Sequence, residues 1–230
     1  MDVGPAIPGW YGKFPPVGDF VGRRLPQKFI DLWHGWLEKG IAASKISLGD
    51  RWLDKYLNCP VWHFLLTPGV CGGSFWAGTL MSSVDKVGRY FPLTIAAEID
   101  ATIHSLATIT ARSEWYTALE QFSMTLLDTR TSIEDLESGL TKIPFPAPDA
   151  VYVNGARGFF QWWVNADSVS KTFHLARPDG VNELVLSAAW QGIANKAAGR
   201  TLWWTSNGQE LHCFVGLPPA SYFSVLLEYR

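Results

Sequence analysis

Hydrophobic residues recur with the three-to-four spacing of an amphipathic helix in the first fifth of the chain. Proline is favoured at the first position of a helix, and Pro26 directly precedes this pattern. The spacing places the apolar residues on one helix face. The pattern predicts a long helix that starts at Pro26 and a shorter one over residues 50–57; the apolar face of the first comprises Phe29, Ile30, Trp33, Trp36, Leu37 and Ile41.

Three strand-length apolar runs follow, over residues 61–66, 75–81 and 90–97. None shows a clean alternation of apolar and polar residues, which is typical of strands covered on both faces. Residues 56–84 contain no Asp, Glu, Lys or Arg, as a membrane span would, but Pro68-Gly69 divides them into two short runs. We therefore predict a buried hairpin and no membrane insertion.

Later in the chain, helix signals occur at Ser113 and at Ser132, where Asp135 completes a capping box. Residues 182–196 carry another helical pattern. Two final strands, residues 201–205 and 211–217, flank the turn sequence Ser-Asn-Gly.

Helices that alternate with a central sheet predict an α/β fold, specifically a three-layer α/β/α sandwich with a mixed, partly antiparallel sheet. Proline-rich residues 143–149 are a possible internal linker. The part after them has too few elements for its own core. We therefore expect residues 1–230 to form a single domain.

Composition narrows the class of protein. The chain is 47% hydrophobic and 17% charged, which is typical of a globular protein, and its net charge of −2 gives no field that favours nucleic acid. It has three scattered cysteines and no basic segment followed by an apolar one at its start. These features favour reduced thiols, no signal peptide and a cytoplasmic protein.

The usual catalytic signatures are missing: the phosphate loop, the dinucleotide fingerprint, the nucleophile elbow and the metalloprotease motif. We therefore expect no enzyme activity, no catalytic residues and no cofactor. Zinc on Cys59, His63, Cys71 and either His212 or Cys213 is chemically possible, but the spacings match no paired knuckle, so we expect no metal. A hydrolase or transferase that uses Cys71, with His63 as its base, stays an alternative.

Two tryptophan pairs offer a different alternative. Adjacent residues on a strand point to opposite faces, so Trp162-Trp163 and Trp203-Trp204 are interpreted as packing in the core and the covering layers. If one of them lies exposed, it could form a platform for a glycan or another small molecule.

Two blocks mix glycines, prolines, charges and aromatics: GKFPPVGDFV at 12–21 and GTLMSSVDKVGRYFPLT at 78–94. We interpret both as shaped loops at the same edge of the sheet. Arginine and tyrosine are common in interfaces, so these loops are expected to form or support a partner-binding surface. The residues concerned are Asp19, Arg23, Asp85, Arg89 and Tyr90.

A structural interpretation of the same charges remains open: Asp19 turns its own loop, and Asp85 pairs with Arg89. A catalytic use of Asp85 and Arg89 is the other alternative.

Together with GWYGK before them, ISLGDRWLDKYLNCPVWHF between them and RTLWWT at 200–205, the two blocks resemble the TagF (ImpM) family of type VI secretion-associated proteins. The resemblance implies a cytoplasmic, non-enzymatic repressor that acts after translation by binding a forkhead-associated scaffold protein. It defines neither an oligomeric state nor the roles of the motif positions, which are Gly12, Pro15, Gly18, Asp19, Phe20, Ser83, Asp85, Gly88, Arg89, Phe91, Pro92 and Trp203.

Overall fold

The computed structural model describes residues 6–101, 104, 106–147, 150–165, 170–173, 181, 184–185, 188–189 and 197–229, with backbone only for 107 and 150–157. At its centre lies a seven-stranded sheet in the order β2-β1-β5-β4-β3-β6-β7. The strands are β1 (Gly9–Lys13), β2 (Phe20–Arg23), β3 (Trp62–Leu66), β4 (Phe75–Met81), β5 (Leu93–Ile99), β6 (Arg200–Trp204) and β7 (His212–Val215).

Every neighbouring pair in this sheet is antiparallel, so the expected mixed sheet is corrected to an antiparallel one. The reason lies in the connections. Parallel neighbours need a long crossover between them, whereas β1–β2, β3–β4, β4–β5 and β6–β7 are each joined directly by a loop. The strands after residue 199 complete the same sheet as those before residue 100.

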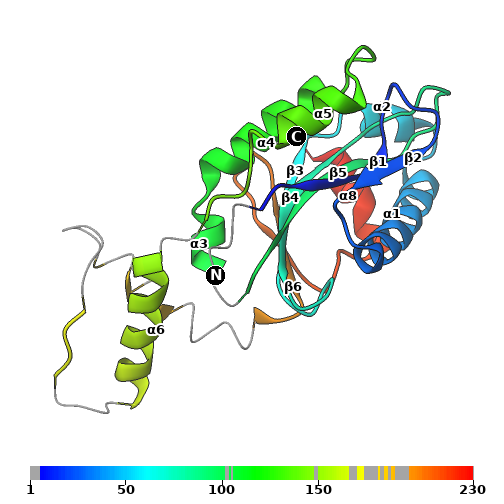
Figure 1. Cartoon of the computed structure of the whole chain (residues 1–230). Coiled ribbons are helices and arrows are strands. Elements are labelled where there is room, and N and C mark those ends of the chain that lie inside the picture. Colours follow the sequence, from blue (N-terminus) through cyan, green and yellow to red (C-terminus); the bar gives the residue numbers. More distant parts are fainter. Residues whose placement is uncertain are drawn as a thin grey trace.

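Helices cover both faces of the sheet (Figure 1), which confirms the three-layer α/β arrangement. One face packs against α1 (Gln27–Leu48), α2 (Trp52–Leu57) and α8 (Phe223–Glu228). The other packs against α4 (Ser113–Thr125) and α5 (Ile133–Leu140). The remaining helical elements are η1 (Gly49–Arg51), α3 (Leu106–Thr110), α6 (Ala150–Asn165) and η2 (Ala220–Tyr222).

This double cover explains the unbroken apolar pattern of the central strands. On β3, Leu65 lies in the core under α4 and α5, whereas Phe64 and Leu66 lie in the core under α1. Successive strand residues point to opposite faces, and here both faces are buried.

The first helices begin within one residue of their predicted starts. Pro26 is the cap before α1 and not its first residue, and the helix of residues 50–57 is divided into η1 and α2. The capping box at Ser132 is present. The helical pattern over residues 182–196 falls largely outside the described residues.

Two sequence interpretations are corrected. The strand expected over 90–97 begins at Leu93, because residues 82–92 form a loop that a bridge between Val84 and Tyr90 closes. Trp162 and Trp163 lie on helix α6, not on a strand.

The possible linker region is packed against the rest of the protein at one position. Phe145 is buried, and its N–H donates to the Ala6 carbonyl.

No helix in the described ranges is both long and apolar enough to cross a membrane.

Candidate functional site

The two glycine-containing blocks meet at one end of the sheet, as expected. β1 pairs with β5 so that Gly12 lies opposite Leu93, which brings the turn after β1 beside the loop before β5. The Lys86 N–H donates to the Val17 carbonyl at 3.1 Å, and the Arg89 guanidinium donates to the Gly18 carbonyl. Both blocks also contribute strand ends, because β1, β2, β4 and β5 begin or end inside them.

A buried ion pair joins the two loops. Lys13 Nζ lies 2.8 Å from Asp85 Oδ2, and the two side chains are 3% and 0% exposed. The carboxylate also accepts hydrogen bonds from the Val87 N–H at 3.0 Å, the Arg89 N–H at 2.9 Å and Arg89 Nε at 2.8 Å. Asp85 therefore links both segments and folds the tip of its own loop.

These contacts decide the charge state of Asp85. Burial alone would raise the pKa of the carboxyl group. The hydrogen bonds from Lys13, from the Arg89 backbone and side chain, and from Val87 outweigh burial and hold the pKa of Asp85 well below its ordinary value. The carboxylate is therefore ionised at neutral pH, and it cannot itself reach a partner. It supports the surface and does not form it.

The backbone geometry explains why glycine occupies two of the motif positions. Gly12 has φ 142°, and a Cβ atom there would lie 2.1 Å from the Pro92 carbonyl oxygen. Gly88 has φ 83° at the loop tip. L-residues with a side chain rarely adopt such backbone angles, so both positions favour glycine.

The aromatic motif positions brace the same end of the sheet. Phe20 stacks on Tyr11 with 5.9 Å between ring centroids and meets Phe91 edge-on at 4.8 Å. Lys13 Nζ lies 4.1 Å from the centroid of the Phe20 ring, in a cation–π contact. These contacts hold Phe20 in place although its side chain reaches the surface.

Ser83 and Tyr90 make contacts that stabilise the fold. The Tyr56 hydroxyl donates to the Ser83 carbonyl at 2.8 Å and accepts from the Ser83 N–H at 3.1 Å. Tyr90 is half-buried against the rings of Trp52 and Tyr56. Of the other motif positions, Pro15 is buried and Gly18 is exposed.

The predicted site residues divide into two groups. Asp19 is exposed, accepts from the Phe20 N–H and lies 4.0 Å from Lys13 Nζ, beside the Asp85 loop. Arg23 lies at the far end of β2, three residues and roughly 10 Å from Phe20, and its guanidinium faces Glu137 on α5 at 3.8 Å. The structure thus brings together Asp19, Asp85, Arg89 and Tyr90 and leaves Arg23 apart.

What the locked loops expose is a compact set of side chains, here called the loop surface: Asp19, Phe20, Lys86, Val87 and Arg89. Val87, at the tip, is 66% exposed. Sequence reasoning missed Val87, although Gly88 directly after it indicated a turn that would expose its neighbours.

His34 on α1 was also missed. The Tyr11 hydroxyl lies 2.8 Å from His34 Nδ1, and His34 Nε2 lies 3.1 Å from Glu38 Oε1. Burial raises the pKa of Tyr11, and the charges of Glu38 and Asp31 add to the shift. The phenol is therefore neutral, and its hydrogen bond with His34 Nδ1 fixes the histidine next to Phe20. The i, i+4 spacing of His34 and Glu38 was the available signal.

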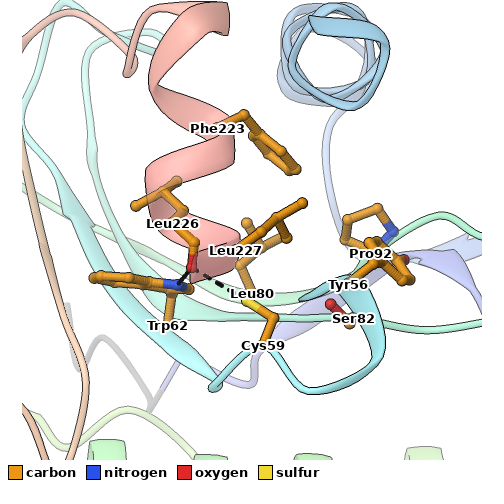
Figure 2. A pocket seen from close by; sticks show the side chains of 9 residues that line it. All are labelled: Tyr56, Cys59, Trp62, Leu80, Ser82, Pro92, Phe223, Leu226 and Leu227. Atoms are coloured by element: carbon orange, nitrogen blue, oxygen red, sulfur yellow. Dashed lines mark hydrogen bonds between the residues drawn. The ribbon is translucent and has the colours of Figure 1, made fainter. Parts of the chain in front are cut away.

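A small hollow is lined in part by Ser82 and Pro92, the first and last residues of the loop over residues 82–92 (Figure 2). In that view the rings of Tyr56 and Trp62 and the side chains of α8 surround Cys59, and the free space of about 10 Å³ fits a single water. Cys59 Sγ donates to the Leu226 carbonyl at 3.4 Å, and burial raises the pKa of this thiol to about 12. The hollow suits neither a substrate nor a reactive thiolate.

The structure also gives little support to Cys71 as a nucleophile with His63 as its base. Burial raises the pKa of Cys71 to about 12, so its thiolate is scarce at neutral pH. Cys71 packs against the core under α1, whereas His63 faces α4, with Nε2 2.8 Å from Glu120 Oε2. His63 is therefore no base for Cys71. Within the described ranges, no three His, Cys, Asp or Glu side chains gather closely enough to hold a metal ion.

The four paired tryptophans differ in whether they are exposed enough to form a binding platform. Trp203 and Trp204 on β6 point to opposite faces, as predicted, but Trp203 is fully buried, so a glycan surface on Trp203 is excluded. On α6, Trp162 is half-buried and Trp163 is exposed.

Comparison with known proteins shows that the loop surface lies within the part of the chain that matches a known family. The family model described as the TagF N-terminal domain, Type VI secretion system-associated, matches residues 9–143. The crystal structure of PA0076 from Pseudomonas aeruginosa PAO1 is similar over 96% of this chain and 93% of that one, with 30% identity and a TM-score of 0.73. No curated protein matches the chain.

Proposed function

Because the chain belongs to the TagF family of type VI secretion-associated proteins, we propose that it is a non-enzymatic regulatory protein of a bacterial type VI secretion system. It acts in the cytoplasm as a post-translational repressor, and it does so by binding a forkhead-associated scaffold protein through the loop surface.

The observation that carries this proposal is the rigid display of exposed side chains by the Lys13–Asp85 ion pair. A binding surface loses affinity when its loops must be ordered on association, and a pre-ordered surface avoids that cost. The loop over residues 82–92 is ordered in advance by the Asp85 carboxylate, which accepts four hydrogen bonds. Its tip nevertheless leaves Lys86, Val87 and most of Arg89 open to a partner.

The residue types on the loop surface also suit protein recognition. Arginine and aromatic residues contribute most to interface energies, and Arg89 and Phe20 supply one of each. Val87 adds an apolar tip between Lys86 and Arg89. A partner with an apolar pocket rimmed by acidic groups would match this arrangement.

The non-enzymatic part of the proposal is supported by the surroundings of the alternative groups. Asp85 is saturated with hydrogen bonds, Cys59 and Cys71 have raised thiol pKa values, and Cys71 lies on the opposite face of the sheet from His63. None of them is poised to act on a substrate.

The experiment that tests the function combines binding with secretion. The purified chain is titrated with the purified forkhead-associated scaffold protein by calorimetry, and secretion is measured in cells that overproduce the chain. Saturable binding and reduced secretion are expected. A chain that binds no scaffold protein while still reducing secretion would overturn the proposed partner.

A further inference from the structure

A buried histidine lies where the sheet meets helix α4. His63 on β3 pairs with Thr79 of β4 and with Trp204 of β6, and it is almost fully buried. Its ring stacks on Tyr116 of α4 at 5.3 Å and meets Trp204 edge-on at 5.7 Å between ring centroids. The imidazole is therefore enclosed on the side of the sheet that α4 covers.

One carboxylate joins this histidine to α4 and to the turn between β6 and β7. His63 Nε2 lies 2.8 Å from Glu120 Oε2. The hydroxyl of Ser206, in the turn after β6, donates to the same carboxylate oxygen. The side chain of Glu120 is 24% exposed, whereas that of His63 is 3% exposed. The group of His63, Glu120 and Ser206, here called the α4 latch, thus connects three segments of the fold.

Protonation would leave His63 with a donor that has no acceptor. A neutral imidazole carries a hydrogen on one ring nitrogen, and the charged form carries one on each. Nε2 faces the carboxylate of Glu120, whereas Nδ1 is buried without a hydrogen-bond partner among the described residues. A buried donor that is left unpaired costs free energy, so the closed arrangement of the latch favours the neutral ring.

The groups around His63 determine when it takes up a proton. Among the described residues that contact or pair with it, Glu120 and Tyr116 on α4 titrate, whereas Thr79 and Trp204 do not. Burial lowers the pKa of His63 below its ordinary value of 6.5, and the charge of Glu120 opposes this shift without cancelling it. Burial also raises the pKa of Tyr116, so this phenol stays neutral.

Polar groups also hold the adjacent part of α4 on the sheet. Thr79 Oγ1 lies 3.1 Å from Ser123 Oγ, and Ser123 also donates to the Leu119 carbonyl. Glu120 and Ser123 are three residues apart, so they lie on the same side of α4. When a segment opens, such hydrogen bonds are exchanged for bonds to water at a small net cost. This side of α4 therefore opens at a lower cost than an entirely apolar contact would.

We propose that the α4 latch is a pH-sensitive device, in which a proton on His63 loosens α4 and the turn at 206–208 from the sheet. In the closed arrangement the charged ring has a buried donor without an acceptor, whereas an opened α4 gives both ring nitrogens access to water. Acid therefore favours opening. By linkage, the stabilisation by the neutral ring is complete well above pH 6.5 and is lost as the pH falls below 6.5 toward the lower pKa of the closed state.

The first test is hydrogen exchange of the full chain, measured by mass spectrometry on peptides of α4 and corrected for the intrinsic pH dependence of exchange. Between pH 7.5 and pH 5.5, the protection of α4 in the wild type should fall roughly threefold or more. His63→Phe keeps a ring against Tyr116 and Trp204 but cannot take up a proton, so it should lose this response. His34→Phe, at a half-buried position on α1, is the matched control and should retain it. Constant protection in the wild type, or an undiminished response in His63→Phe, would overturn the inference.

The second test does not depend on the folding of His63→Phe. An NMR titration of the His63 ring in the wild type should give a midpoint below 6.5. In Glu120→Gln the midpoint should be lower still, because the neutral amide no longer favours the proton. The side chain of Glu120 is partly exposed, so this variant is expected to fold. A midpoint at or above 6.5, or one that Glu120→Gln leaves unchanged, would contradict the latch.

Discussion

Lys13 and Asp85 are 72 residues apart in the chain, and their side chains form an ion pair of 2.8 Å inside the protein. The pair lies where β1 ends and where the loop between β4 and β5 folds back. It converts two loops into one surface, so its loss should affect both the stability of the fold and the shape of the loop surface.

Replacing Lys13 by Met should lower the free energy of unfolding by about 1.5–3 kcal/mol, because Asp85 would lose one charged donor inside the protein while Arg89 still pairs with it. The measurement is urea denaturation at pH 7. The double variant Lys13→Met/Asp85→Leu removes both charges but also the acceptor of the Val87 and Arg89 N–H groups, so it should recover only a small part of the loss. A single variant that costs less than about 1 kcal/mol would show that the pair has no organising role.

The same pair predicts how stability depends on pH. The pKa of Asp85 is lower in the folded chain than its ordinary value of 3.8. Its contribution is therefore complete above about pH 5 and is lost as the pH falls below 3.8 toward the lower pKa of the folded state. Denaturation curves from pH 7 down to pH 2.5 should show this decrease.

Other carboxylates also contribute to acid unfolding, so the wild type is compared with Asp85→Asn. The difference in unfolding free energy between the two proteins should shrink as the pH falls below 3.8. A difference that stays constant over the whole range would contradict the assigned pKa direction.

The chain should unfold as a single cooperative domain despite the prolines at 143–149. β3 pairs with β6 along four residue positions, and the strands after residue 199 complete the sheet. Calorimetry of residues 1–230 should show one transition, and a fragment of residues 1–143 should lack it, because β3 would lose one neighbour. Two separate transitions, or a fragment with its own cooperative unfolding, would establish two domains.

The cysteines should differ in reactivity. Cys213 is exposed, whereas burial raises the pKa values of Cys59 and Cys71 to about 12. At pH 7.5 a thiol reagent should modify Cys213 at least tenfold faster than the other two, as mass spectrometry of digested samples would show. Rapid modification of Cys71 would reopen the possibility of a nucleophile there.

Long, strongly patterned elements were predictable from the sequence. α1 begins one residue after the predicted start, and β4 has the predicted bounds, because their apolar spacing is decided locally. β1 and β2 were missed, since glycines and charges in Gly9–Lys13 and Phe20–Arg23 resemble loop residues. Their strand character comes from pairing with β5 and with each other, which no local pattern records.

The site shows the same division. The meeting of the two loops was foreseen, but the exposed Val87 and the burial of Asp85 were not. A single charge in a glycine-containing loop is normally solvated, and only the position of Lys13 after folding explains why this one lies inside. Tertiary contacts between distant segments also placed Arg23 beside Glu137 and away from the other predicted residues.

The central claim is that the loop surface binds the scaffold protein, and Val87→Asp tests it most directly. Val87 is exposed at the tip, so a carboxylate there should leave the melting temperature unchanged while it opposes docking of an apolar, acid-rimmed partner. Ile46→Asp, at an exposed position on α1, is the matched control.

The deciding measurement is the dissociation constant of the scaffold protein, determined by calorimetry on folded wild type, Val87→Asp and Ile46→Asp. The account predicts at least a tenfold weaker complex for Val87→Asp, about 1.4 kcal/mol or more, with Ile46→Asp equal to the wild type. A folded Val87→Asp protein that binds the scaffold as tightly as the wild type would contradict the claim.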